Sequence, residues 1–330
     1  MLPDRTSFLR SVVAVVVVAA IGLLFIASYA GALHDPQPHR VPVAVFGPPR
    51  LAAALEGSSA LKVIRVPDEA AARRAVDRRD AYGAVIAGEA SIEVVVAPAA
   101  SPAIALLLRD ELPRRLRQAG PVHVTTVHPL PQDDLRGGVS FYVAVGLVIA
   151  GYLASSLLTV AFGPRPGRVR VAWRMGSVAG LGIVMGVGGA LLGHAIGGFG
   201  GSWLGLAAFG LLVVLAVGWS TMAMHAALGT AGTGVAILVF VILGNPSSGG
   251  PTAHELLPGL WRAVGPLIPT GAGVTGIRDI AYFPAAPLGG PLLVLLVWAA
   301  LGAAVALGFG DRAMSGDPEV EASMAAAAAP

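Results

Sequence analysis

Long apolar runs dominate the chain, and short polar segments separate them, except for one longer polar stretch after the first run. A helix needs about 20 apolar residues to cross the hydrocarbon core of a bilayer. The longest run is long enough for two crossings, with a break at residues 225–234, where "HAALGTAGTG" places glycines and a histidine. The pattern therefore predicts six transmembrane helices, at residues 12–32, 139–162, 175–199, 203–244 (two crossings) and 288–310.

The first run also has features of a signal peptide. Arg5 and Arg10 precede the apolar core, and "SYA" at residues 28–30 would suit a cleavage site. The core is longer than the 7–15 residues usual in such signals. We expect a retained span, with a cleaved signal as the alternative.

The loop at residues 163–174, "GPRPGRVRVAWR", is basic and contains no acidic residue. Short loops rich in arginine and lysine stay in the cytoplasm. With six spans, this places both termini in the cytoplasm and makes the chain a multi-pass protein of the cell membrane. We expect residues 1–32 to form a cytoplasmic N-terminus with the first span, and residues 311–330 to form a disordered cytoplasmic tail.

Residues 33–138 alternate strand and helix signals and are expected to form a small extracytoplasmic α/β domain. Asp68 is a suitable N-cap for the second helix, Pro102 fits the first position of the third, and Pro113 is expected to kink or end that helix. The helices are predicted at 50–57, 68–80 and 101–120, and the strands at 41–47, 61–66, 82–88, 91–98 and 122–130. The arginines at 73, 74, 78 and 79 fit a solvated helix face, or alternatively a site for anionic lipid or wall polymer.

The polar segment "GNPSSGGPTAHELLPGLW" (244–261) interrupts the apolar pattern before the last span. It leads into two short helical candidates, 254–267 and 271–283, separated by Pro266 and Pro269. Neither can cross a bilayer, and irregular backbone at membrane depth needs cover from protein or from a water-filled cavity. We therefore expect a five-helix domain, 139–310, with a re-entrant helical hairpin at 254–283. The alternative is an amphipathic loop at the interface, with Trp261 and Tyr282 as headgroup anchors.

Composition narrows the chemistry. The chain is 55% hydrophobic and 12% charged, with a mean hydropathy of +0.75, whereas globular domains are about 25% charged. The absence of cysteine excludes disulfides and thiolate sites, and Lys62, the only lysine, does not lie in a Walker A loop. The "GAGVTG" at 271–276 does not follow a strand, the histidines show no compact metal-ligand spacing, and no nucleophile elbow occurs. We expect no enzyme activity, cofactor, metal or nucleic-acid partner.

The order of one span, an α/β domain and five spans with a broken hairpin resembles the permeases of type-2 ABC exporters, and more narrowly their phage-infection-protein (YhgE/Pip-like) branch. The resemblance covers nearly the whole chain. Four sequence segments carry it: "VPVAVFGPP", "AVDRRDAYGAVI", "HPLPQDDLRG" and residues 244–283. Many members of that branch have a much larger external domain.

The resemblance implies a homo- or heterodimer that exports a hydrophobic or amphipathic substrate, powered by a separate ATP-binding subunit. The outer gate would comprise Ser247, Ser248, Pro258, Trp261, Pro266, Pro269, Arg278 and Tyr282. The ATPase would dock on Arg165, Arg168, Arg170 and Arg174, whose alternative role is topogenic only. The rival function is a membrane-anchored surface receptor or assembly factor whose external domain binds a partner.

Some polar and small residues within the apolar regions have two interpretations each. Arg278 and Asp279 would pair with neighbours or with Glu255 to hold the hairpin closed, or would reach the interface by snorkelling. His194 and His225 are candidates for a proton role or for headgroup contact. Small residues four positions apart let two helices approach closely. The pairs Gly182 with Gly186 and Gly189 with Gly193 fit this pattern. They would serve helix packing within the chain or, alternatively, the interface of a homodimer.

Overall fold

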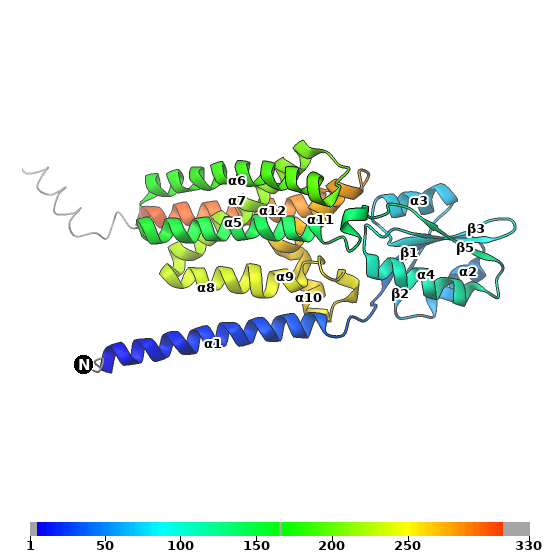
Figure 1. Ribbon diagram of the computed structural model, residues 1–330, viewed down its shortest axis with the longest axis horizontal. Coiled ribbons are helices and arrows are strands. Elements are labelled where there is room, and N and C mark those ends of the chain that lie inside the picture. The colour runs from blue at the N-terminus through cyan, green and yellow to red at the C-terminus, as the bar shows by residue number, and fades with distance from the viewer. Residues whose placement is uncertain (1–4, 165–166, 313–330) are drawn as a thin grey trace, which may run out of the picture.

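The computed structural model describes residues 5–164 and 167–312 and shows a mostly helical chain with a small mixed sheet at one end (Figure 1). Arg165 and the tail from residue 313 lie outside the described residues. Five helical segments are long and apolar enough to cross a membrane. They are Ser11–Leu33, Val139–Phe162, Arg168–Gly197, Trp203–Ser247 and Gly289–Phe309. A multi-pass membrane protein is therefore the class to which this structure belongs.

The segment Trp203–Ser247 folds back on itself. Helix α7 (Trp203–Leu228) ends in the short turn η2 (Gly229–Ala231), at the break that the sequence predicts. The chain then returns beside α7 through α8 (Gly232–Ala236), the π-helix η3 (Ile237–Leu243) and α9 (Gly244–Ser247), as Figure 1 shows. At 1.5 Å per residue this returning arm measures about 24 Å, somewhat less than the roughly 30 Å hydrocarbon core.

Helix α7 lies at the centre of the bundle, and α5 (Val139–Phe162), α6 (Arg168–Gly197) and α12 (Gly289–Arg312) pack around it. Glycines make these approaches close. A Cβ at Gly186 would lie 2.3 Å from the carbonyl oxygen of Ala207, and one at Gly182 would lie 2.7 Å from a methyl of Leu211. Gly189 faces α5, and Gly193 lies against the ring of Phe199. The glycine pairs therefore serve packing within the chain.

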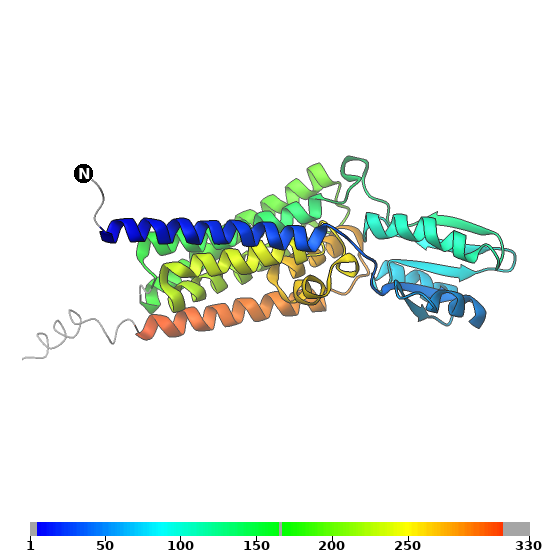
Figure 2. The same ribbon diagram turned by 90° about the horizontal axis from the view of Figure 1, so that it is seen from below.

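Helix α1 (Arg5–Leu33) is exposed along most of its described length and packs near its C-terminal end against η3 and α9 (Figure 1). There the indole of Trp261 lies against Gly31 and its Nε1 donates to Ser28 Oγ at 3.3 Å. Ser28 in turn donates to the carbonyl of Ile242 in the π-helix at 2.6 Å. Both α1 and α12 have their free ends at the end of the bundle away from the sheet (Figures 1 and 2).

The sheet lies between α1 and α5 in the chain and has the strand order β2-β1-β3-β4-β5. Strand β1 pairs in parallel with β2 and β3, β3 pairs antiparallel with β4, and β4 pairs in parallel with β5. The strands are β1 (Val41–Phe46), β2 (Leu61–Arg65), β3 (Gly83–Ala87), β4 (Ile92–Val96) and β5 (Val122–Thr126). All five expected strands are therefore present.

The three expected helices of this α/β domain are also present, and they cover both faces of the sheet. Helices α2 (Pro49–Glu56) and α4 (Pro102–Leu116) pack on one face and α3 (Glu69–Asp77) on the other. Asp68 caps α3 by accepting from the backbone of Ala71 at 2.6 Å, as expected. Pro113 lies inside α4 without ending it.

The segment before α12 forms four short pieces: η4 (His254–Leu256), α10 (Gly259–Val264), η5 (Gly265–Leu267) and α11 (Pro269–Tyr282). Helix α11 is buried among α5, α7 and α12 along almost its whole length. Thr270 at its start donates to the carbonyl of Phe240 in the π-helix at 3.0 Å. This helix is therefore an internal part of the bundle and not a loop lying on its surface.

Candidate functional site

The most polar buried region lies where the α/β domain meets the bundle, and residues of both parts form it. Phe283, which follows α11, is 1% exposed and packs into the apolar cluster under the α3 face of the sheet. Ala253 and Leu256 pack into the cluster on the opposite face. The segment between α9 and α12 therefore holds the sheet from both sides.

A buried ion pair connects the two parts. Arg79, in the turn between α3 and β3, donates through its guanidinium to the Asp279 carboxylate near the end of α11. The side chains are 14% and 6% exposed. Burial raises the pKa of Asp279, and the neighbouring Arg79 opposes that shift. The guanidinium also lies 5.5 Å from the ring centre of Phe283, within cation–π range.

Arg278, the neighbour of Asp279, is 6% exposed and faces backbone carbonyls. Its guanidinium donates to Gly249 at 3.0 Å, to Gly250 at 3.4 Å and to Ala100 at 3.5 Å. Burial lowers the pKa of Arg278 to about 10, so the side chain stays charged at neutral pH. Arg278 thereby links the 249–250 turn and the turn between β4 and α4 to the C-terminal part of α11.

His128 forms a second polar link between the two parts. Its Nδ1 lies 3.1 Å from the carbonyl oxygen of Tyr282, and its Nε2 lies 2.8 Å from the Asp77 carboxylate. Because both partners are acceptors, the protonated imidazole can donate to both. The ring also contacts Phe283, with centroids 4.5 Å apart.

Backbone strain coincides with this cluster. Among the described residues, the non-glycine residues with positive φ are Arg40 (51°), Arg79 (56°) and His128 (44°). Two of the three provide the links to α11. Such conformations cost on the order of 1–3 kcal/mol each and persist where surrounding contacts over-determine them. The strained backbone therefore indicates that the position of these two side chains matters.

The opposite face of the sheet has its own link. The Tyr82 hydroxyl donates to Glu255 at 2.6 Å, and the backbone N–H of His39 donates to the Glu255 carbonyl at 2.7 Å. Burial raises the pKa of Tyr82, so the hydroxyl keeps its proton. Together, the side chains that form these links between the α/β domain and the bundle are called the junction cluster. They are Asp77, Arg79, Tyr82, His128, Glu255, Arg278, Asp279 and Phe283.

Several expected gate residues lie elsewhere. Ser247 and Ser248 are fully buried, and their hydroxyls donate to carbonyls of their own turn, at Leu243 and Asn245. Trp261 contacts α1. Pro258, Pro266 and Pro269 begin α10, η5 and α11 in turn. Of the expected set, Arg278 and Tyr282 are the two that the structure brings to the junction.

The expected pairing of Arg278 or Asp279 with Glu255 does not occur. Asp279 pairs with Arg79 and Glu255 with Tyr82, both of which belong to the α/β domain. Arg79 was expected on a solvated helix face, but it turns into the junction. The alternation of charges along residues 73–80 does not show which arginine is buried. In the structure Arg79 has a positive φ and its side chain contacts Asp279.

A second buried polar network lies in the bundle, near the turn between α5 and α6. Arg174 is 2% exposed and donates to the carbonyl of Gly163 at 3.0 Å and to Thr159 Oγ1 at 2.5 Å. Thr159 contacts His225 Nδ1 at 3.0 Å, and His225 Nε2 contacts Thr233 Oγ1 at 2.8 Å. Arg174 therefore joins α5 to α6 and does not belong to an exposed docking loop, whereas Arg168 and Arg170 are exposed.

The two histidines in apolar segments have local partners. His225 is 1% exposed and belongs to the network just described. His194 contacts the carbonyls of Ala190 at 2.8 Å and Gly201 at 3.1 Å, near the sheet end of α6. Within the described part of the chain, no group of three histidine or acidic side chains is placed to hold a metal ion.

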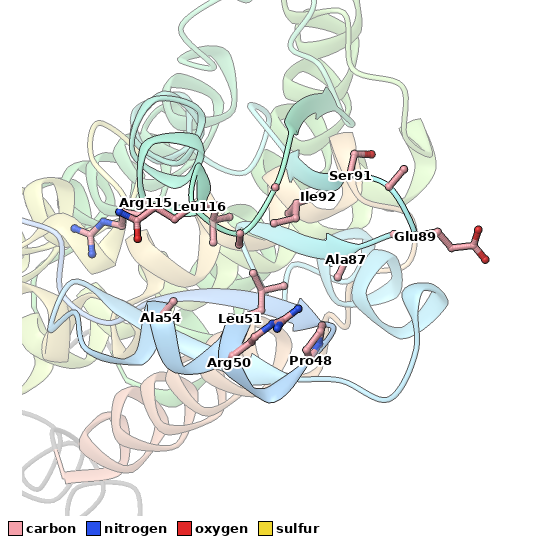
Figure 3. A pocket seen from close by; sticks show the side chains of 15 residues that line it. Pro48, Arg50, Leu51, Ala54, Ala87, Glu89, Ser91, Ile92, Arg115 and Leu116 are labelled. Carbon is pink, nitrogen blue, oxygen red and sulfur yellow. The ribbon is translucent and has the colours of Figure 1, made fainter.

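A cavity of about 510 Å³ opens at the far tip of the α/β domain, beyond the carboxyl ends of β1 and β3 (Figure 3). Helix α2, which follows β1, and helix α3, which precedes β3, cover opposite faces of the sheet. The connections of the two neighbouring strands therefore diverge at this edge, and open α/β sheets bind ligands at such topological switch points. Arg50 and Leu51 of α2 lie on one side, and Ser91 and Ile92 lie on the other (Figure 3). This crevice was not predicted from the sequence.

Comparisons with known proteins add no relationship: no family model, curated protein or solved structure matches this chain.

Proposed function

We propose that this chain is the membrane subunit of an export system of the type-2 ABC kind. It would cross the bilayer six times, with the α7 to α9 segment counted as two crossings and the α/β domain outside the cell. It would work as a dimer and move a hydrophobic or amphipathic molecule outward, powered by a separate ATPase. The bilayer and that ATPase are the partners this proposal requires.

One observation supports the proposal most strongly: the α/β domain is fastened to α11, and α11 is buried in the bundle. A change in helix packing would therefore move the domain, because Arg79 and Asp279 connect them directly. Packed interfaces of this kind tend to have discrete arrangements and not continuous ones. An exporter needs such coupling between its helices and its outer side.

The exposed arginines Arg168 and Arg170 belong to the first turn of α6, and α6 begins at the end of the bundle opposite the domain (Figure 1). Under this proposal that end faces the cytoplasm and offers the ATPase a basic surface. Arg174, which is buried, would act only by holding α5 and α6 together.

The test is ATP hydrolysis by the co-expressed ATPase encoded nearest to this gene, with the complex in nanodiscs. Because the chain contains no cysteine, the double variant Arg79→Cys with Asp279→Cys can be joined by a short bis-methanethiosulfonate cross-linker, whose two disulfide bonds a reductant cleaves. The expected result is loss of substrate-stimulated hydrolysis when cross-linked and recovery on reduction. A single Arg79→Cys variant given the same reagent is the control. Failure of any ATPase to copurify, together with unchanged export on gene deletion, would refute the proposal.

The rival function, a surface receptor or assembly factor, is favoured by the cavity at the far tip of the domain. In that case the bundle only anchors the domain. Partner capture should use the full chain in nanodiscs, because Phe283 and Leu256 complete the two apolar faces of the sheet. Tight capture that Arg50→Glu abolishes, without any ATPase in the complex, would favour the receptor.

A further inference from the structure

A hollow of about 390 Å³ lies on the α/β domain, between the first turns of α4 and the loop that leads into α5. We call it the α4 hollow. Its α4 wall consists of residues spaced three or four apart, which places them on one face of the helix: Pro102, Ala105, Leu106 and Arg109. Leu130 and Leu135 of the loop line the other side. Among the described side chains that line the α4 hollow, Arg109 alone is charged.

The loop beside the α4 hollow is fixed on the bundle. The Asp134 carboxylate accepts from the backbone N–H of Gly138 at 2.8 Å, at the start of α5. Pro131 lies against the end of α6, where a Cβ at Gly198 would be 2.9 Å from the Cβ of Pro131. Leu135 follows Asp134 directly and is 72% exposed. The apolar lining therefore continues to the first turn of a helix that can cross a membrane.

This part of the molecule lies at the surface of the bilayer. Helix α5 has 24 residues and measures about 36 Å, so its ends extend beyond a hydrocarbon core of roughly 30 Å. Tyr142 and Trp203, near the starts of α5 and α7, are 69% and 54% exposed, as expected of aromatic residues at a membrane interface. The α4 hollow therefore begins at the level of the lipid headgroups.

Helix α4 extends the hollow away from the bilayer. It begins beside the bundle and runs away from it (Figures 1 and 2). From Pro102 to Arg109 is about 10 Å along the helix, and the headgroup layer is about 5–7 Å thick on each side of the core. Arginine side chains are long enough to reach back toward a membrane interface. The guanidinium of Arg109 can therefore meet a lipid phosphate while the apolar lining covers part of an acyl chain.

We propose that the α4 hollow binds an anionic phospholipid from the leaflet on the side of the α/β domain. Its phosphate lies on Arg109, and the upper part of one acyl chain lies against Leu106 and Leu135. Arg109 donates to the neutral hydroxyl of Thr126 at 3.0 Å, and within the described part of the chain its guanidinium pairs with no carboxylate. Arginine recognises phosphate through charge-assisted hydrogen bonds. A zwitterionic headgroup gains less, because it brings a cation of its own.

The bound lipid would also hold the α/β domain in place. The loop residue Pro129 lines the α4 hollow, and His128, which precedes it, belongs to the junction cluster. A lipid between α4 and this loop contacts the domain and the entry to α5 at once. A ligand that binds only the assembled arrangement stabilises it. This binding does not depend on the proposed export function.

The experiment uses the full chain in phosphatidylcholine nanodiscs, without any ATPase. Phosphatidylglycerol and phosphatidylcholine, each with a diazirine in the upper part of one acyl chain, are added in trace amounts, and labelled peptides are read by mass spectrometry. We expect phosphatidylglycerol to label the peptides containing Leu106 and Leu135 at least fivefold more than phosphatidylcholine. The middle of α5, where Leu153 and Leu157 are exposed, should be labelled equally by both lipids and serves as the internal control.

Two variants test the role of Arg109. Arg109→Gln should remove the preference for phosphatidylglycerol. Thr126→Val deletes the hydrogen bond to Arg109 but keeps the cation, so the preference should remain. Equal labelling of these peptides by both lipids, or a preference that survives in Arg109→Gln, would overturn the proposal. Absence of label on these peptides while α5 is labelled normally would overturn it as well.

Discussion

The Arg79–Asp279 ion pair should control how firmly the α/β domain is held on the bundle. In Arg79→Ala, the Asp279 carboxylate remains buried without its counter-charge. Removing one partner of a buried ion pair costs about 3–5 kcal/mol. The Arg79 side chain is 14% exposed, so we expect a cost about 1 kcal/mol below that range, about 2–4 kcal/mol.

Amide hydrogen exchange of the protein in nanodiscs measures this effect locally. If separation of the domain from α11 exposes the turn before β3, exchange there should accelerate by about 30- to 700-fold, at one decade per 1.4 kcal/mol. Amides at the centre of α7 should keep their rates. Arg78→Ala is the matched control, because Arg78 is the adjacent residue and its pair with Asp80 is exposed, where such pairs contribute about 0–1 kcal/mol.

A double-mutant cycle then tests the pairing itself. Arg79→Ala and Asp279→Ala in one chain should cost less than the sum of the single changes, with a coupling energy of about 1–3 kcal/mol. The reasoning would be refuted if exchange in Arg79→Ala matched that in Arg78→Ala, or if the two changes were additive.

The other predictions concern stability and packing. Burial lowers the pKa of His254 to about 4, so as pH falls the unfolded chain takes up a proton on this histidine before the folded chain does. The contribution of His254 to the free energy of unfolding should be complete above pH 6.5 and fall by about 3 kcal/mol as the pH drops to 4. The melting temperature should fall over the same pH range, and His254→Phe should remove that dependence. Gly186→Val should lower the melting temperature, because its Cβ would lie 2.3 Å from a carbonyl oxygen of α7, whereas Gly188→Val, on the same helix with nothing within 4 Å, should not. Trp261→Ala should release α1, which spin labels on α1 and α12 would report as a broader distance distribution.

Secondary structure was largely predictable because local signals carried it. Asp68 and Pro102 mark the starts of their helices by capping and by fixed φ, whatever the rest of the chain does. The break near Gly229 follows in the same way from glycines in an apolar run. Pro113 was ambiguous, since a proline near a helix end is tolerated when neighbouring contacts hold the helix, as Leu112 and Leu116 do here.

The junction cluster was mostly not predictable, because its partners lie far apart in the chain. Arg79 and Asp279 are 200 residues apart, and nothing in "DRRD" distinguishes Arg79 from its exposed neighbour Arg78. The inward turn of Arg174 was missed for a related reason. A positive charge near a span end predicts sidedness, but whether it faces water or the bundle depends on helix rotation.

By itself, the sequence determined the apolar segments, their lengths and breaks, and the elements of the α/β domain, because hydrophobic periodicity and capping act over a few residues. The tertiary structure alone decided which charges are buried and paired. It also placed Phe283 beneath the sheet and brought Asp279 to Arg79 at the junction. These contacts depend on how whole helices rotate and pack, which is set by the sum of many distant interactions.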